Sequence, residues 1–359
     1  MRIALKFLEG IRDLIVGAHS TVARGVDLVQ VRTNFEVGRR IVQEEQRGKD
    51  RATYGKQVIG ALADRLTSEF GRGFSDTNLK LMRLFYLQYQ HRIGQSPTDQ
   101  FKTLAKSQSL TDQLAPAVRN PFTLSWTHYV VLLGVKNPNE RSFYEIESVK
   151  QNWTVRELKR QFASGLYERL ALSRGKKGIR RLAKVGQTVA HSRDLLKEPL
   201  VLEFLGLDER SHYSESDLES AIINQIERFL LEMGKGFLFE ARQKRFTFDE
   251  DHFFVDLVFY NRLLRCYVLL DLKIGKIGHQ DLGQMQMYVN YFDRFVKTGQ
   301  ENPTIGILLC KQRNKALVEI TLPKSSNIHA REYRLYLPSK DELQRKLLGW
   351  MEEQDATHD

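Results

Sequence analysis

The stretch FFVDLVFYNRLLRCYVLLDLK, from Phe253 to Lys273, decides how the second half of the chain folds. It holds two apolar runs rich in aromatic and β-branched residues, Phe253–Tyr260 and Arg265–Lys273, with a short turn between them. Strands joined by so short a turn are expected to pair antiparallel. Because neighbouring strands lie about 5 Å apart, an acid in each run, Asp256 and Asp271, can share one divalent cation.

The charges in these runs favour phosphodiester hydrolysis. Asp271 and Lys273 are two residues apart on one strand, so they point to the same face. Carboxylate oxygens are ligands for Mg²⁺ (or Mn²⁺), and a lysine can orient the attacking water or contact the phosphate. The alternative is structural: Asp256 as an acid at a sheet edge, and Asp271 and Lys273 as a solvated strand end.

Composition indicates a polyanionic partner. The chain has 359 residues, a net charge of +11 and a pI of about 9.5, which favours two domains and nucleic acid as the first candidate partner. The two cysteines, Cys266 and Cys310, lie in predicted apolar strands and are expected to be free core residues of a cytoplasmic protein. No signal peptide, membrane segment or small-molecule cofactor is expected.

Residues 1–168 are predicted to form a mostly helical N-terminal domain that binds DNA or dimerises. Apolar residues at helical spacing predict a helix from Tyr54 to Phe70, a glycine turn, and a second helix that Ser75 or Asp76 caps and that ends near Gln90. This pair is compatible with a helix-turn-helix DNA reader, and a plain helical hairpin is the alternative. In such a reader, the second helix would present four polar residues to a groove, Asn78, Lys80, Arg83 and Gln88. Arg72, in the turn, would lie near phosphate.

A basic, glycine-broken stretch follows, and residues 169–200 are predicted to be a linker. Such linkers either touch the nucleic-acid backbone or are merely solvated. The residues proposed to contact nucleic acid here are Lys176, Lys177, Arg180 and Arg181. At the other end, residues 352–359 are expected to form a disordered acidic tail.

Residues 201–351 are predicted to form an α+β domain with the order αβββαβ, a mixed sheet flanked by helices. The expected helices and strands are helix Asp217–Met233, strands Phe237–Phe248, Phe253–Tyr260 and Arg265–Lys273, helix His279–Phe295, strand Thr304–Lys311, a further strand Tyr333–Leu337 and a closing helix Lys340–Met351.

This order, with an acid on the second strand and D-x-K at the end of the third, resembles the PD-(D/E)XK nuclease superfamily and its restriction-endonuclease-like fold. More closely, the chain resembles the YhcG-like family, in which an uncharacterised helical N-terminal domain precedes such a nuclease domain. The segments that carry the closer resemblance are NFEVGRRI at 34–41, FGRGFS at 70–75, LSWTHY at 124–129, FLGL at 204–207 and DLKIGK at 271–276.

The resemblance implies a set of site residues. Asp256 takes the place of the first motif acid, although Val255 replaces the proline of the motif, and Asp271 and Lys273 take the places of the second acid and the lysine. Gln284 and Tyr288 resemble a Q-x-x-x-Y signature and, at i and i+4, share a helix face. The other implied contacts are Glu219 and the Leu272 carbonyl as further metal ligands, and Lys276 at the phosphate.

The resemblance further implies a Mg²⁺-dependent deoxyribonuclease that works in DNA defence, recombination or repair. Two alternatives stay open: a catalytically silent DNA-binding or assembly module with a nuclease fold, and an RNA-processing nuclease. A homodimer that cuts both strands is expected. The sequence does not set endonucleolytic or exonucleolytic action.

Overall fold

The computed structural model describes residues 27–46, 51–92, 121–172, 176–195, 197–207, 212–248, 250–323 and 326–345. Contacts between residues divide the chain into two compact units, Met1–Leu158 and Lys159–Asp359. The expected acidic tail at 352–359 lies outside the described residues. None of the helices in the described ranges is long and apolar enough to cross a membrane.

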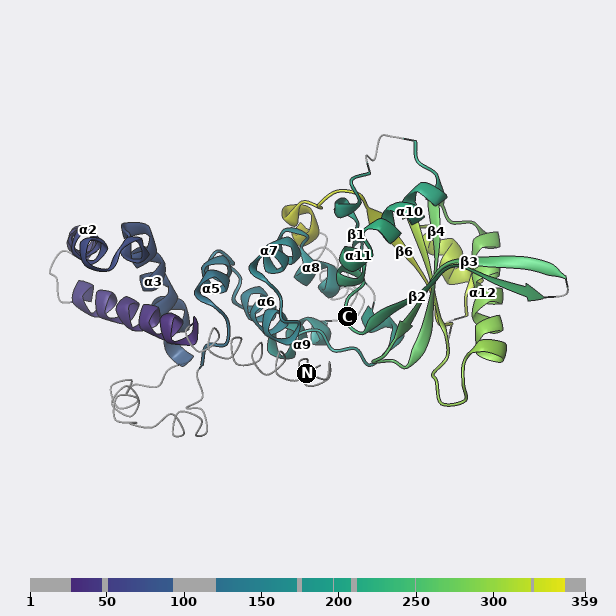
Figure 1. Cartoon of the computed structure of the whole chain (residues 1–359), viewed down its shortest axis with the longest axis horizontal. Coiled ribbons are helices and arrows are strands. Elements are labelled where there is room, and N and C mark those ends of the chain that lie inside the picture. Colours follow the sequence, from purple (N-terminus) through teal and green to yellow (C-terminus); the bar gives the residue numbers. More distant parts are fainter. Residues whose placement is uncertain are drawn as a thin grey trace, which may run out of the picture. The chain divides into compact units, whose positions relative to one another are not determined.

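The first unit is helical where it is described, as predicted. Besides a helix at 27–46, its elements are α2 (Arg51–Phe70), η1 (Arg72–Phe74), α3 (Asp76–Tyr89), η2 (Gln90–Arg92), α5 (Trp126–Leu133) and α6 (Pro138–Lys150); α7 (Val155–Ala163) crosses the boundary between the units (Figure 1).

The predicted helix–turn–helix pair is α2 and α3. Gly71 ends α2 with φ +85°, a backbone conformation that glycine adopts without steric cost. The Ser75 hydroxyl then accepts a hydrogen bond from the Asn78 backbone N–H and caps α3. The inner face of α3 joins an aromatic core in which the ring of Phe85 lies 4.9 Å from the rings of Phe122 and Tyr129.

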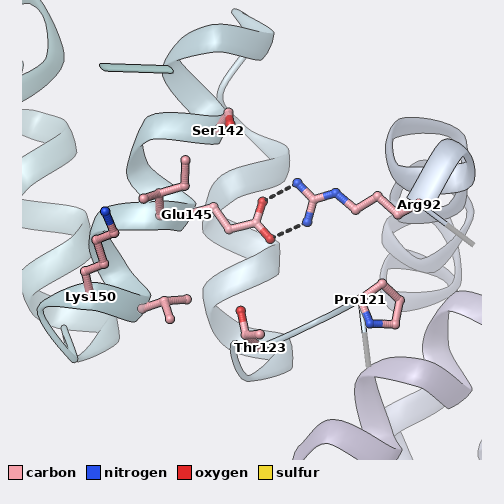
Figure 2. A pocket seen from close by; sticks show the side chains of 8 residues that line it. Arg92, Pro121, Thr123, Ser142, Glu145 and Lys150 are labelled. Carbon is pink, nitrogen blue, oxygen red and sulfur yellow. Dashed lines mark hydrogen bonds and ion pairs between the residues drawn. The ribbon is translucent and has the colours of Figure 1, made fainter. Parts of the chain in front are cut away.

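A buried carboxylate also ties the first unit together. The two oxygens of Glu145 accept hydrogen bonds from Arg92 at 2.6 and 2.8 Å (Figure 2). The Tyr129 hydroxyl donates a third hydrogen bond to Glu145, at 3.1 Å. A pocket of 270 Å³ lies beside this ion pair, lined also by Thr123, Lys150 and their neighbours. Since Arg92 already satisfies the charge of Glu145, we assign this ion pair a structural role.

The second unit is a six-stranded mixed sheet with helices on both faces. Its elements are α8 (Leu166–Leu172), α9 (Lys176–Val185), η4 (Ser192–Leu195), β1 (Leu200–Val201), η5 (Glu203–Leu205), α10 (Glu215–Asn224), α11 (Ile226–Met233), β2 (Phe237–Phe248), β3 (Asp251–Asn261), β4 (Cys266–Lys276), α12 (His279–Tyr291), the π-helix η6 (Phe292–Val296), β5 (Ile305–Gln312), α13 (Lys315–Thr321) and β6 (Ile328–Arg334), with a helix at 340–345. The strand order is β1-β6-β5-β4-β3-β2.

The expected αβββαβ core is present. β2, β3 and β4 pair antiparallel, and β5 and β6 continue the sheet in parallel with β4. One hydrophobic core packs α10 and α11 on one face, and a second packs α12 on the other. The free thiols of Cys266 and Cys310 are buried, as expected.

Three expected elements differ from the observed ones. The helix expected over Asp217–Met233 is interrupted at Gln225, whose backbone leaves the helical region, so it forms α10 and α11. The last strand, expected over Tyr333–Leu337, begins earlier as β6, where Ile328 and Ala330 supply its buried face. The stretch expected as a linker contains α9, whose Leu182 is buried while Arg180, Arg181 and Lys184 are exposed.

The hairpin of β2 and β3 extends beyond the rest of the sheet (Figure 1). Its two strands pair as far as Phe248 and Asp251, whereas pairing between β3 and β4 runs only from Asn261 to Leu257. Asp256 therefore sits where β3 leaves β4 and where backbone groups of β4 lose their partner strand.

Candidate active site

Asp256 and Asp271 come together where β3 parts from β4. The last pair of the ladder is Leu257 with Leu270, so Asp256 and Asp271 occupy the next position in the same register. Asp256 Oδ2 accepts a hydrogen bond of 2.8 Å from the Leu272 backbone N–H, which takes the place of a ladder bond. The antiparallel pairing expected from the sequence is thus confirmed, and it brings the two acids to one place.

Lys273 lies beside Asp271 on the same face of β4. Its Nζ is 2.9 Å from Asp271 Oδ2, 3.8 Å from Glu215 Oε2 and 3.9 Å from Asp281 Oδ1. Burial lowers the pKa of Lys273, but the three carboxylates outweigh burial and raise it above its ordinary value. The lysine is therefore a stable ammonium donor at neutral pH.

The charged form of Asp271 is disfavoured by its surroundings. The residue is 3% exposed. Burial, and next the negative charge of Asp256, raise the pKa of Asp271 to about 7, against the opposing effect of Lys273. Apart from the ion pair with Lys273, Asp271 Oδ2 is a buried atom that accepts no hydrogen bond. A carboxylate in this condition is suited to receive a cation.

The donor set fits a magnesium ion. Mg²⁺ is commonly held by one or two carboxylates and keeps several waters, and Asp256 and Asp271 supply two. In the part of the chain that the structure describes, no group of three or more His, Cys, Asp or Glu side chains is arranged to hold a metal. Glu219 as a further ligand therefore stays a prediction.

Glu219 is instead engaged by two residues of β2. It is 4% exposed, and its Oε1 accepts a hydrogen bond of 2.6 Å from Arg242 Nε. Its Oε2 accepts one of 2.7 Å from Gln243 Nε2, which also donates to Asp256 Oδ1 at 3.0 Å. Glu219 is thus connected to Asp256 through the amide of Gln243.

Gln284 and Tyr288 lie on α12 as predicted, but only one of them is buried. Tyr288 is enclosed, packs edge-on against Phe246, and has a pKa raised chiefly by burial. Gln284 is exposed and donates a hydrogen bond to the Tyr288 hydroxyl. Gln284 thus reaches the tyrosine, and no bond to Lys273 is seen among the described residues.

Four residues at this site escaped sequence reasoning: Arg242, Gln243, Glu215 and Asp281. Asp281 had a signal, because an acid three residues after Gly278 caps a helix start, and its Oδ2 accepts a hydrogen bond of 2.8 Å from the Gly278 N–H. Glu215 opens α10 in a run of acids that reads as an ordinary helix start. Arg242 and Gln243 had no signal, since polar residues alternate along any exposed edge strand.

The expected nucleic-acid contacts in the first unit are already engaged within it. Asn78 Oδ1 accepts a hydrogen bond of 3.1 Å from the indole N–H of Trp126. Arg83 pairs with Glu45 at 2.7 Å, and Lys80 pairs with Asp76 on the surface at 2.6 Å. The contacts of Asn78 and Arg83 hold α3 to its neighbours, whereas Lys80 and Asp76 both lie on α3. The use of α3 as a reading helix stays a prediction.

The remaining expected contacts are exposed where they are described. Arg180 and Arg181 lie on the outer side of α9, and Lys276 is exposed at the end of β4. The side chains of Arg72, Lys176 and Lys177 lie outside the described part.

Comparisons with known proteins agree with this architecture. Residues 193–348 match the family described as YhcG PDDEXK nuclease domain, and residues 10–169 match the DUF1016 N-terminal domain. A protein of Escherichia coli (strain K12) named "Putative nuclease YhcG" is 39% identical over 355 residues, which cover 95% of this chain and 92% of that protein.

Two solved structures also match part of the chain. They are a crystal structure of a repair endonuclease from Pyrococcus abyssi (17% identity, TM-score 0.24) and a structure of an EndoMS-dsDNA2 complex (16% identity, TM-score 0.25). Each match covers 37% of this chain and 50% of the solved chain. The similarity to the Escherichia coli protein extends over nearly the whole chain, and it confirms the resemblance seen in the sequence motifs. The chain belongs to the YhcG family, with a DUF1016 N-terminal domain followed by a nuclease domain of the PDDEXK type.

Proposed function

We propose that this protein is a metal-dependent nuclease that hydrolyses phosphodiester bonds of DNA. The observation that carries the proposal is the buried Asp271 carboxylate, held beside Asp256 with a pKa near 7 and with Lys273 as its cationic partner. Asp256, Asp271 and the Leu272 carbonyl would hold Mg²⁺ or Mn²⁺. The bound cation would lower the pKa of a coordinated water and neutralise charge on the phosphate.

Lys273 is assigned the task of orienting the attacking water or the phosphate. Its raised pKa favours the protonated form at neutral pH, which suits the role of a hydrogen-bond donor. An ammonium has three N–H donors, and the contact with Asp271 Oδ2 uses one of them. The others can donate to a water or to a phosphate oxygen.

The Tyr288 hydroxyl also stays protonated at neutral pH, because burial raises its pKa. Gln284 donates to that hydroxyl and so fixes the direction in which the tyrosine proton points. The proposed role of Gln284 and Tyr288 is to place one hydrogen-bond donor beside Asp271, where the substrate would bind.

DNA as the substrate is supported by charge. The chain carries a net charge of +11, and Arg180, Arg181 and Lys276 are exposed cations of the second unit. Lys176, Lys177 and Arg72 are proposed to add to these contacts. In the first unit, α3 would read DNA only if Asn78 and Arg83 exchange their present partners for the nucleic acid.

Three further assignments belong to this proposal. The helical part to residue 168 would bind DNA or dimerise, and residues 201–351 would carry the chemistry. Two copies would let a homodimer cut both strands of a duplex. The buried free thiols of Cys266 and Cys310 suit a reducing cytoplasm.

The test is cleavage of linear, circular, branched and single-stranded DNA, and of structured RNA, with Mg²⁺, Mn²⁺ or EDTA. Wild type is compared with Asp271→Asn, Lys273→Ala and the control Asp341→Asn, whose acid is exposed. The proposal expects DNA cleavage that EDTA abolishes, that both site variants lose and that the control keeps. Cleavage of RNA alone would assign an RNA-processing nuclease. Metal-independent DNA binding without any cleavage would assign a silent binding module.

A further inference from the structure

Gln243 is the one side chain that connects Glu219 to the paired aspartates in the described structure. Its Nε2 lies 2.7 Å from Glu219 Oε2 and 3.0 Å from Asp256 Oδ1. A side-chain amide nitrogen carries two hydrogens, so one can be donated to each carboxylate. Both donors of the amide are thereby used in holding these two acids at a fixed separation.

The backbone at Gln243 is held in an unusual conformation. Arg242 pairs with Leu257 and Lys244 with Val255, so Gln243 lies across the hairpin from Asp256. Its φ is +46°, in the left-handed region that a residue other than glycine adopts only at a steric cost. Such a conformation persists when the surroundings hold it, and here the two carboxylates anchor the side chain.

Gln243 and the Leu272 backbone together fix Asp256. Gln243 donates to Oδ1, and the Leu272 N–H donates to Oδ2 at 2.8 Å. A carboxylate held at both oxygens cannot rotate about its last bond, and each oxygen keeps a lone pair for a further ligand. The folded protein therefore orients the Asp256 carboxylate before a cation binds, so binding loses little further side-chain entropy.

Glu219 has no oxygen without a donor. Arg242 Nε donates to Oε1 and neutralises the charge, while Gln243 donates to Oε2. A carboxylate paired with a guanidinium gains less from a cation than one that lacks such a partner. Glu219 is therefore placed to support Asp256 and not to bind metal itself.

We propose that Gln243 is a positioning residue through which Glu219 acts on the metal ligand Asp256. This inference rests on the metal site of the proposed function. It assigns direct binding to Asp256 and Asp271, and it gives Glu219 and Arg242 the task of holding the Gln243 amide. Outer partners of metal ligands are typically worth 10–100-fold in metal affinity.

The experiment is a titration with Mn²⁺ alone, in which free ion is followed by its electron paramagnetic resonance signal. Wild type is compared with Gln243→Ala, Gln243→Gly, Glu219→Gln and the double variant Glu219→Gln/Gln243→Ala. The control is Gln286→Ala, a glutamine of α12 that bonds only Asn290 among the described residues. Each variant is used after its melting temperature has shown that it is folded.

Gln243→Ala is expected to weaken Mn²⁺ binding about 10-fold, with Gln286→Ala at the wild-type value. Gln243→Gly should weaken it equally although glycine accepts the positive φ, because the amide is what matters. Glu219→Gln should weaken binding no more than Gln243→Ala does, and the double variant should be no worse than Gln243→Ala, since both changes break one chain of contacts.

Two results would overturn the inference while leaving the proposed nuclease intact. One is Gln243→Ala binding Mn²⁺ as tightly as wild type. The other is Glu219→Gln losing Mn²⁺ binding that Gln243→Ala retains, which would make Glu219 a direct ligand. Wild type that takes up no Mn²⁺ at all would instead remove the proposed metal site, and this inference with it.

Discussion

Two groups of buried charges in the second unit differ in how completely they are satisfied. Glu232 on α11 is 0% exposed and accepts hydrogen bonds from Arg169, from Arg160 at 3.2 Å and from the Val201 backbone N–H at 3.0 Å. Arg169 is itself fully buried. Together these contacts join α7, α8 and β1 to α11.

The cluster around Asp271 has a similar burial and the opposite balance of charge. Burial by itself raises the pKa of Glu232, but Arg169, Lys197 and Arg160 lower it to about 2. Asp271 has one cationic partner among the described residues, Lys273, and its pKa rises to about 7. A buried acid by itself thus does not mark a functional site; an excess of negative charge that the protein leaves uncompensated does.

The comparison predicts its largest effect on stability at Glu232. Glu232→Gln leaves Arg169 buried without a counter-charge, so the free energy of unfolding should fall by about 3–5 kcal/mol. Urea unfolding followed by circular dichroism measures this, with Glu227→Gln, an exposed acid on the same helix, as the control. Equal stability of the two variants would show that Glu232 does not hold α7, α8 and β1 to α11.

At Asp271 the effect on stability should have the opposite sign. The pKa in the folded state, about 7, lies above the ordinary value of 3.8 for an aspartate, so this group's stabilising contribution is complete below pH 3.8 and is lost as pH rises through 7. Asp271→Asn removes that loss. Measured in EDTA, its stability relative to wild type should therefore increase by roughly 2–4 kcal/mol from pH 4 to pH 8. A difference in stability between the variant and wild type that does not change with pH would contradict a raised pKa of Asp271 in the folded state.

The smallest effects are expected at exposed charges, which solvent screens. Arg180→Ala and Arg181→Ala should each weaken DNA binding a few-fold at low salt and lower the slope of log affinity against log salt by about 0.9. Fluorescence anisotropy over a salt series measures both quantities. Arg228 is an exposed arginine of α11, and Arg228→Ala should change neither the affinity nor the slope. Equal effects for all three variants would show that Arg180 and Arg181 contribute only through net charge.

The sequence was sufficient for the parts of the site that lie along neighbouring strands. Short turns and alternating apolar residues predicted that Asp256 and Asp271 would meet, and the period of a strand predicted Lys273 on the face of Asp271. The i, i+4 spacing predicted that Gln284 and Tyr288 share a helix face, and in the structure their side chains are joined by a hydrogen bond. In each case the contact is fixed by local geometry.

Contacts between distant elements could not be read in the same way. Glu219 and Gln243 are joined through the packing of α10 on the sheet, and the positive φ at Gln243 carries no mark in a row of polar residues. Arg169 begins the stretch predicted to be a basic linker, because an arginine among basic residues gives no sign of its buried partner Glu232. Amphipathic spacing shows which face of a helix is buried, but not which side chains meet there.

The central claim is that Asp271 belongs to a site for a divalent cation, and thermal unfolding with and without Mn²⁺ tests it without knowledge of the substrate. A ligand that binds the folded state at 100 times its dissociation constant stabilises it by about 2.7 kcal/mol. Wild type should therefore melt at a temperature that rises with Mn²⁺, while Asp271→Asn should melt at one temperature throughout. An equal rise for the variant would place the cation elsewhere and contradict the account.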